Sequence, residues 1–274
     1  MPAPTAGWKP ALQDMDAQTD CRELQPAPLA QKRRAGWMAS IQSLATTVVI
    51  AVFVITFLVQ AFQIPSESME NTLLIGDYLL VDKVRFGQSG TWGAILPYRS
   101  VSRGDIIVFR YPVHPTQHFV KRVVALPGDR VRLINKRVLV NGRPVDEEYA
   151  LYKGLGRDQY RDDFPAPDFP APSIEVRWWA QLRSVVRDGE LVVPADCYFV
   201  LGDNRDQSLD SRYWGFVPRE NVIGRPLLIY WSVDSSGPVA VLEGSQGDRL
   251  SHFVYAMTHV FQDTRWNRTF RIVK

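Results

Sequence analysis

Three short stretches of this chain hold hydroxyl, amine and carboxylate side chains at spacings that could support nucleophilic catalysis. The first, residues 62–73, reads FQIPSESMENTL and contains Ser66 and Ser68. The second, residues 119–129, reads FVKRVVALPGD, and the third, residues 202–218, reads GDNRDQSLDSRYWGFVP. A serine hydroxyl can act as a nucleophile when a neighbouring amine takes its proton. Serines beside an Ile-Pro pair are, however, by default turn or helix-cap residues.

The lysine of the second stretch has an unusual setting for a charged residue. If residues 119–124 form a strand, alternation places Phe119, Lys121 and Val123 on one face. Such a lysine either reaches water over its own methylenes or is buried. Burial lowers the pKa of an ammonium, and a neutral lysine can deprotonate a serine without any histidine. The third stretch packs charges and hydroxyls too densely for an ordinary solvated loop, which favours fixed hydrogen-bonding roles.

An uncharged segment, from Ala35 to Ser66, leads into the first of these stretches and overlaps its beginning. Its most apolar part, Ser43 to Phe62, would rise about 30 Å as a helix, which matches the hydrocarbon core of a bilayer. We therefore predict a transmembrane helix. Basic residues 32–34 precede it and acidic residues follow it, so the positive-inside rule places the N-terminus in the cytoplasm. No later segment reaches spanning length, which predicts a single crossing.

The alternative is a secretory signal peptide, because Val59 and Ala61 form a small-residue V-x-A spacing after the apolar run. A signal peptide has a short basic region and about 7–15 apolar residues, whereas here a long N-terminal segment precedes a longer run. The anchor is favoured. We expect residues 1–34 to form a cytoplasmic tail, residues 35–62 the transmembrane anchor segment, and residues 63–274 an extracytoplasmic catalytic domain.

The external part has the pattern of a mainly β domain. Gly-Asp turns at residues 76–77, 104–105 and 128–129 each open an apolar or alternating run. The Asn141-Gly142 pair is typical of a two-residue hairpin turn. Later strands are expected at residues 191–193, 198–201 and 227–233.

Part of this domain is expected to be an inserted subdomain, at about residues 135–196. Within it, residues 159–172 alternate proline with aromatics, which predicts an exposed loop. The fold class is therefore mainly β, with one N-terminal transmembrane helix and an inserted subdomain.

Composition narrows the functional classes. The net charge of +3 gives no strong field for nucleic acid, so we expect no nucleic-acid partner. The chain has 2 cysteines and 4 histidines, too few for a zinc ribbon or a disulfide scaffold. Cys21 and Cys197 are expected on opposite sides of the membrane. His114 and His118 have a metal-pair spacing that Pro115 disrupts, and we expect neither metal nor cofactor.

Taken together, the motifs resemble bacterial type I signal peptidase, the membrane-anchored S26 family of serine proteases. The resemblance rests on IPSESMENTLLIGDYLLVDK, RGDIIVF, KRVVALPGD and GDNRDQSLDSRYWGFVP, in the family's order and after an anchor of the expected orientation. It implies the signal peptidase I fold and cleavage of signal peptides from exported preproteins at the bacterial plasma membrane. We expect a monomer. The tail, the proline-rich insertion and about the last 40 residues lie outside the resemblance.

The resemblance also implies roles for individual residues. Ser68 matches the nucleophile and Lys121 the general base. The hydroxyl of Ser66 and the backbone N–H of Ser68 match the oxyanion hole. The matching support residues are Ser208, which orients the lysine, the ion pair of Asp210 with Arg212, and the loop residues Asp203 and Asn204.

Substrate recognition follows from the same resemblance. The family has two shallow pockets for small residues at the first and third positions before the cut. The matching residues are Phe62, Ile64, Met69, Leu73, Phe119 and Val120. Their bulk would leave room for alanine and not for leucine. An extended substrate would pair with the enzyme through backbone hydrogen bonds, as in β-strand addition.

Two positions depart from the family pattern. Glu67 stands where glycine is frequent, and Gln207 stands where asparagine is commoner. If Glu67 faced the site it would stabilise protonated Lys121, but alternation around Ser68 indicates that it points away.

Two other segments have two interpretations each. Trp92, Ile95, Leu96 and Pro97 either dip into the membrane interface or pack internally. The C-terminal TRWNRTFRIVK, residues 264–274, either lies on anionic lipid or closes the fold.

Two alternative functions stay open at this point. A related Ser-Lys membrane protease would cut other membrane-proximal segments and would reject small-residue sites in preproteins. A non-catalytic anchored β-domain would only bind exported chains, and it would tolerate substitution of Ser68 or Lys121.

Overall fold

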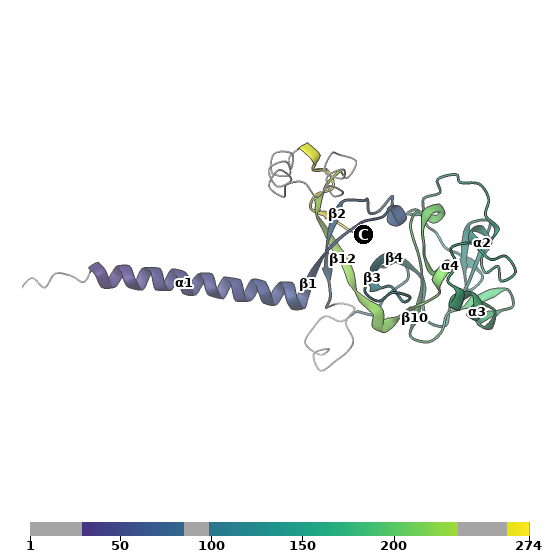
Figure 1. Ribbon diagram of the computed structural model, residues 1–274, viewed down its shortest axis with the longest axis horizontal. Coiled ribbons are helices and arrows are strands. Elements are labelled where there is room, and N and C mark those ends of the chain that lie inside the picture. The colour runs from purple at the N-terminus through teal and green to yellow at the C-terminus, as the bar shows by residue number, and fades with distance from the viewer. Residues whose placement is uncertain (1–28, 85–98, 235–261, 274) are drawn as a thin grey trace, which may run out of the picture. The chain divides into compact units, whose positions relative to one another are not determined.

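The computed structural model describes residues 29–84, 99–234 and 262–273 (Figure 1). Within these ranges the chain forms one long N-terminal helix, two β-sheets and several short helical segments. The mainly β fold predicted from the Gly-Asp turns is confirmed. Most of the tail, and the stretch from Trp92 to Pro97, lie outside the described residues.

The N-terminal helix α1 spans Leu29–Phe53, and a π-helical turn, Val54–Leu58, continues it. Residues Gly36–Thr56 are long and apolar enough to cross a membrane. The predicted helix to Phe62 is wrong at its end, because Val59–Gln63 forms strand β1. This strand pairs antiparallel with β2, Asp77–Asp82. Only Val59 and Phe62 favour a strand by propensity, so the pairing with β2, which satisfies the backbone groups that a helix would otherwise bond, decides the conformation.

The larger sheet has eight strands in the order β1-β2-β12-β3-β4-β10-β11, with β13 also paired to β12. Register shifts in β12 mark bulges, which bend a strand, and Figure 1 shows the sheet curling along β12. The remaining strands of this sheet are β3 (Ile106–Arg110), β4 (His118–Ala125), β10 (Cys197–Leu201), β11 (Val217–Pro218), β12 (Val222–Ser232) and β13 (Arg271–Ile272).

At β3 this sheet is buried on both faces. Along β3, Ile106 and Val108 join one apolar cluster, while Ile107 and Phe109 join another. The first cluster includes Met69, so it lies directly under the segment that carries Ser68. Alternation along a strand therefore links the packing of the sheet to the position of the site.

A second, five-stranded sheet has the order β7-β6-β5-β9-β8. The predicted hairpin is confirmed, since Asn141 and Gly142 join β6 to β7 with φ of 52° and 73°. Positive φ at both positions is what a type I′ turn requires. The strands are β5 (Arg130–Ile134), β6 (Arg137–Val140), β7 (Arg143–Pro144), β8 (Val186–Arg187) and β9 (Glu190–Val192).

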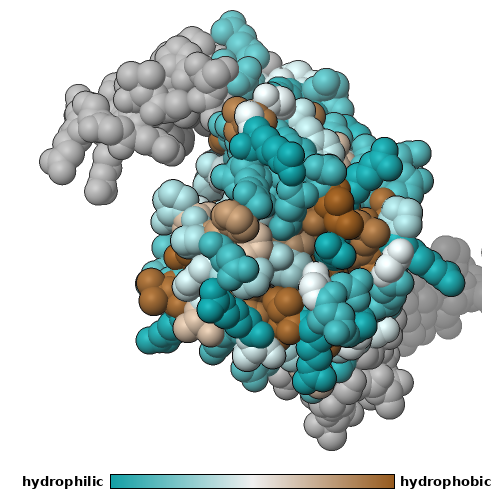
Figure 2. All heavy atoms as spheres, turned by 90° about the vertical axis from the view of Figure 1, so that its right-hand side faces the viewer, coloured by the Kyte–Doolittle hydropathy of each residue, from teal (hydrophilic) through white to brown (hydrophobic). Residues whose placement is uncertain are grey.

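The proline-rich stretch does not form the exposed loop that its sequence predicts. Phe164 is fully buried and stacks on Phe199 at 5.7 Å between ring centroids. The sequence analysis also missed helix α3, in which Trp178 and Leu182, one turn apart, pack into the same core. Figure 2 shows that polar side chains cover most of the outer face at this end, with small separate apolar groups.

The helices are α2 (Gln159–Asp162), α3 (Val176–Val185) and α4 (Ser211–Trp214), with 3-10 turns at Glu67–Met69, Arg205–Gln207 and Arg219–Asn221.

The C-terminal segment, residues 262–273, packs onto the larger sheet. Its strand β13 pairs with β12, and Val273 is buried in the cluster under Ser68. Arg268 is buried against Asp77, with Nη2 2.6 Å from Oδ2, and it also donates to the backbone oxygen of Thr72 at 3.0 Å. The segment therefore ties β2 to the chain that follows Ser68.

Arg268→Met leaves the fully buried Asp77 carboxylate without its cation. We expect the free energy of unfolding to fall by about 3–5 kcal/mol, the usual cost of breaking a buried pair by removing one partner. Urea unfolding of the detergent-solubilised chain measures it. Arg271→Met, an exposed arginine of the same segment, is the matched control and should change stability little. Equal stability of the two variants would contradict a stabilising role for the buried ion pair between Arg268 and Asp77.

Candidate active site

Ser68 lies on a tight turn that is anchored in the core on both sides. The turn follows β1, where Ile64 donates its N–H to the backbone oxygen of Asp77 at 2.9 Å. Met69, the next residue after Ser68, is 1% exposed, and Leu73 is fully buried. The backbone around Ser68 is therefore held by apolar packing before any polar contact is considered.

The structure brings Ser68 and Lys121 together. Lys121 projects from β4, and its Nζ donates to Ser68 Oγ at 2.5 Å. Both side chains are buried, at 8% and 4% exposure. The Phe119 ring, two residues earlier on the strand, lies 5.6 Å from Nζ. Lys121 thus has apolar surroundings and a hydroxyl as its hydrogen-bond partner.

Burial lowers the pKa of Lys121 to about 8, because the ammonium loses water of solvation. The carboxylates of Asp210 and Asp203 oppose this shift, and the Arg212 guanidinium supports it. A lysine with this pKa supplies a useful fraction of free amine near neutral pH.

Ser66 and Ser208 lie near this pair in two different environments. Ser66 Oγ lies 3.3 Å from Ser68 Oγ. Ser208 is buried, and its hydroxyl has no hydrogen-bond partner among the described residues. It lies against Gly202, where an added Cβ would collide with Ser208 Oγ and with the backbone oxygen of Ser68. Glycine at position 202 therefore lets the loop approach the nucleophile closely.

Asp210 and Arg212 form a bidentate ion pair that is almost fully buried, with Nε–Oδ1 of 2.9 Å and Nη2–Oδ2 of 2.8 Å. Burial alone would raise the pKa of Asp210, but the Arg212 guanidinium and the N–H of Gly202 hold it below its ordinary value. Arg212 also donates to the backbone oxygen of Arg205 at 2.9 Å. The pair thus joins the two ends of the 202–212 loop.

Asp203 has its own arginine, which the sequence analysis missed. Arg122 donates to it through Nε at 2.8 Å and through Nη2 at 2.7 Å, and Thr72 Oγ1 donates at 2.5 Å. The next loop residue, Asn204, donates its backbone N–H to the Ser68 oxygen at 3.2 Å. The sequence could have indicated a buried, paired role for Arg122, because this residue follows Lys121 in a strand that is otherwise mostly apolar.

A cleft of about 570 Å³ opens above Ser68 and Lys121. Five of the six predicted pocket residues line it, and Leu73 does not, because it packs inward with Met69 and Ile64. Ile75, His118 and Leu209 also line the cleft, and no sequence pattern had indicated them. The five predicted residues that line the cleft are Phe62, Ile64, Met69, Phe119 and Val120.

Two strand edges border this cleft. In the part of the chain that the structure describes, β1 pairs with β2 alone. Residues 118–121 of β4 pair with β3, whereas β10 pairs only from Arg122 onward. Both edges therefore have backbone groups available to an added strand.

Glu67, the departure beside the nucleophile, is paired away from Lys121. Its carboxylate lies 2.9 Å from Lys153 Nζ, and the same ammonium lies 2.5 Å from Glu70. The Glu67 side chain is half exposed at the rim of the cleft.

Comparison with known proteins finds one family. The family described as "Signal peptidase, peptidase S26" matches residues 37–231. A signal peptidase I of Leptolyngbya laminosa is 35% identical over 224 residues, which cover 78% of this chain and 89% of that protein. The signal peptidase I of Aquifex aeolicus (strain VF5) is 35% identical over 251 residues, 79% of this chain and 93% of that protein.

A third relative, the signal peptidase I of Pseudomonas fluorescens, is 39% identical over 193 residues, which cover 65% of this chain and 66% of that protein. The matched region includes residues 37–53 of α1, Ser68, Lys121 and the 202–212 loop. The chain therefore belongs to the signal peptidase I family of serine proteases, peptidase S26.

Proposed function

We propose that this chain is a membrane-bound serine endopeptidase that cleaves signal peptides from exported preproteins, with Ser68 as nucleophile and Lys121 as general base. The observation that carries the proposal is the 2.5 Å contact between the two buried side chains at the floor of the cleft. Membership of the signal peptidase I family supports the substrate class.

The first half of the reaction forms an acyl-enzyme. At pH 7 about a tenth of Lys121 is neutral, given its pKa of about 8. The free amine takes the proton of Ser68 as Oγ bonds to the carbonyl carbon of the scissile peptide. The Ser66 hydroxyl and the Ser68 N–H stabilise the developing oxyanion. The C–N bond then breaks, and Lys121 returns the proton to the leaving amine.

The second half repeats this chemistry with water. Lys121 deprotonates a water molecule that attacks the acyl carbon, the ester bond to Ser68 breaks, and Lys121 returns the proton to Ser68 Oγ. In this scheme Ser208, whose buried hydroxyl has no partner among the described residues, orients the lysine. The pairs Asp210–Arg212 and Arg122–Asp203, with Asn204, keep the loop against the nucleophile.

Substrate binding uses the two strand edges and the apolar cleft. An extended preprotein segment adds between the edges of β1 and β4, so its backbone supplies most of the recognition. Small side chains at the first and third positions before the cut enter the cleft beside Phe62, Ile64 and Val120. This arrangement accounts for tolerance of varied sequences.

In the proposed topology, residues 1–34 are cytoplasmic and the span follows, in the plasma membrane of a bacterium. The basic residues 32–34 support this orientation. The domain from β1 onward lies on the outer face, and it carries the insertion of about residues 135–196, which contains most of the second sheet. A monomer contains the whole proposed machinery.

The first test is cleavage of a purified preprotein with alanines before its cut site by the detergent-solubilised chain. Wild type should release the mature protein, and Ser68→Ala should release none. Ser66→Ala removes one oxyanion donor and should lower kcat by about 100-fold or more.

Cleavage by Ser68→Ala would show that another residue is the nucleophile. If folded wild type does not cut, the related-protease or binding-only alternative replaces this proposal. The two alternatives then differ in one result. Ser68→Ala abolishes processing of other membrane-proximal segments if the chain is a related protease, and has no effect if the chain only binds them.

The pH dependence follows from the base. Because Lys121 must be neutral to act, kcat/KM should rise with pH through about 8 and level off above it. An unshifted lysine would place this rise near 10.5. Initial rates between pH 6 and 10.5 measure it, with an unfolding monitor at each pH. A rise near the unshifted value would contradict a buried base.

Pocket size gives a further prediction. Alanine→leucine at the first position before the cut should lower kcat/KM by at least about tenfold, because the larger side chain must displace the apolar residues that line the cleft. Leucine at the second position is the control, since alternation points that side chain away from the cleft. Equal losses at both positions would contradict the proposed binding mode.

A further inference from the structure

A short segment of the insertion contacts both parts of the active site. We call residues 147–153, which follow β7, the strap. Its odd-numbered residues Glu147, Tyr149, Leu151 and Lys153 all contact the Ser68 turn, the 202–212 loop or the arginine that follows the base. Residues 147–150 form a turn in which the Ala150 N–H donates to the Glu147 oxygen at 2.9 Å, and Leu151 then forms an isolated bridge with Asn204.

The strap holds the turn that carries the nucleophile. Asn71 donates Nδ2 to the backbone oxygen of Tyr149 at 3.0 Å. Asn71 has a φ of 91°, a conformation that L residues rarely adopt and that surrounding contacts must maintain. On the other side of the turn, the Lys153 ammonium binds both Glu67 and Glu70, which flank Ser68.

The strap also holds the 202–212 loop. Leu151 donates its N–H to the Asp203 oxygen at 2.7 Å and accepts from the Arg205 N–H at 2.9 Å. Glu147 forms a bidentate pair with Arg205, at 2.8 and 2.5 Å. Both side chains of this pair are buried, so the contact is well shielded from water.

Tyr149 lies at the centre of these contacts. Its ring covers the Arg122 guanidinium at 3.9 Å, and Arg122 is the partner of Asp203. A planar guanidinium stacked on an aromatic ring is fixed in orientation as well as in position. Arg122 is the next residue after Lys121 on β4, so its placement and that of the base are linked through one strand.

We propose that the strap is a positioning element of the active site, in which Tyr149 acts through Arg122 and Asp203 to align Lys121 with Ser68. The inference rests on the proposed function and adds residues from the insertion to it. The charged groups around the base are then Asp203, Asp210 and Arg212, with Arg122 neutralising the first. Loosening Arg122 leaves the Asp203 carboxylate less compensated, which favours protonated Lys121.

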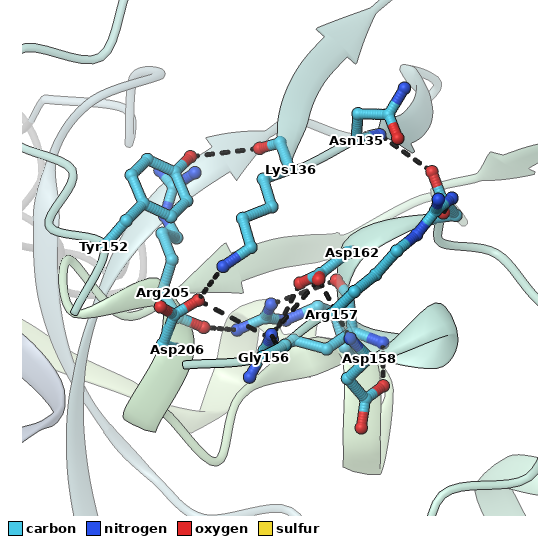
Figure 3. Close-up of polar contacts among 12 residues, drawn as sticks. Asn135, Lys136, Tyr152, Gly156, Arg157, Asp158, Asp162, Arg205 and Asp206 are labelled. Atoms are coloured by element: carbon cyan, nitrogen blue, oxygen red, sulfur yellow. Dashed lines mark hydrogen bonds and ion pairs between the residues drawn. The ribbon is translucent and has the colours of Figure 1, made fainter. Parts of the chain in front are cut away.

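Tyr152 of the strap also contacts another part of the insertion. Tyr152 donates its hydroxyl to the backbone oxygen of Lys136 at 3.0 Å, and Lys136 reaches Asp206 at 2.7 Å. Figure 3 shows Tyr152 and Lys136 side by side above Asp206, with Asp162 and its neighbours beyond. This cluster joins the insertion to itself and to the loop at a position that contacts neither Ser68 nor Lys121.

The test compares three variants of the full chain in detergent, using the alanine-site preprotein. Tyr149→Leu removes the ring over Arg122, and we expect kcat to fall by about tenfold with KM unchanged, as for a displaced catalytic pair. The rise of kcat/KM should also move to higher pH. Tyr149→Phe keeps the ring and should restore both. Phe169→Leu is the matched control: it removes an exposed ring elsewhere in the insertion and should leave kcat and the pH profile as in wild type.

A second variant keeps the inference testable if Tyr149→Leu does not fold. Lys153→Met removes an ammonium at the surface and leaves Glu67 and Glu70 uncompensated beside Ser68. The rise of kcat/KM should again move to higher pH. Wild-type kinetics and pH profile in the folded Tyr149→Leu variant would overturn the proposal, and so would a loss that Tyr149→Phe does not restore. If Tyr149→Leu does not fold, an unchanged profile in Lys153→Met would overturn it.

Direct titration of Lys121 by NMR separates this inference from the proposed function. The pKa of Lys121 is measured without substrate in wild type, Tyr149→Leu and Tyr149→Phe. A higher pKa in the leucine variant alone supports the strap even if wild type cuts no preprotein. Cleavage by wild type with no change in this pKa or in kcat supports the proposed function and overturns the strap.

Discussion

The structure depends on keeping a lysine ammonium out of water beside a serine. Desolvation is what makes Lys121 a weak enough acid to release its proton, but the two nearest carboxylates, Asp203 and Asp210, oppose that effect. Each carboxylate is held by an arginine in a buried bidentate pair. The two arginine pairs therefore hold the loop and also neutralise charges that would otherwise keep the base protonated.

The curled sheet makes this arrangement possible. Strand β4 directs Lys121 toward Ser68 and the next residue, Arg122, toward Asp203, so one strand serves the reacting pair and the loop. Apolar packing of Met69 and Leu73 holds the Ser68 turn from below, and Gly202 lets the loop approach it from the other side. Polar contacts then act on a backbone that packing has already placed.

Local signals predicted much of this architecture. The Gly-Asp turns and the Asn141-Gly142 pair are short-range signals that depend on only a few residues. They therefore predict where the adjacent strands begin and end. The end of the anchor helix was not predictable in the same way. The sequence of residues 59–63 is compatible with a helix and with a strand, and only the pairing with β2 decides between them. Phe164 and Leu73 depend on partners far along the chain. For the site, motif resemblance indicated Ser68 and Lys121, whereas Arg122 and the strap require contacts that only the folded chain shows.

The change from helix to strand before Ser68 also determines where the chain can vary in length. In β1, Phe62 faces the cleft in a register that pairs Val59 with Asp82 and Gln63 with Tyr78. One residue inserted or deleted between Val59 and Ser68 would turn every following side chain to the opposite face of the strand. Residues before Val59 carry no such constraint, because a span tolerates small changes in length by tilting. Related chains should therefore differ freely in the length of the anchor and keep the number of residues from β1 to the nucleophile constant.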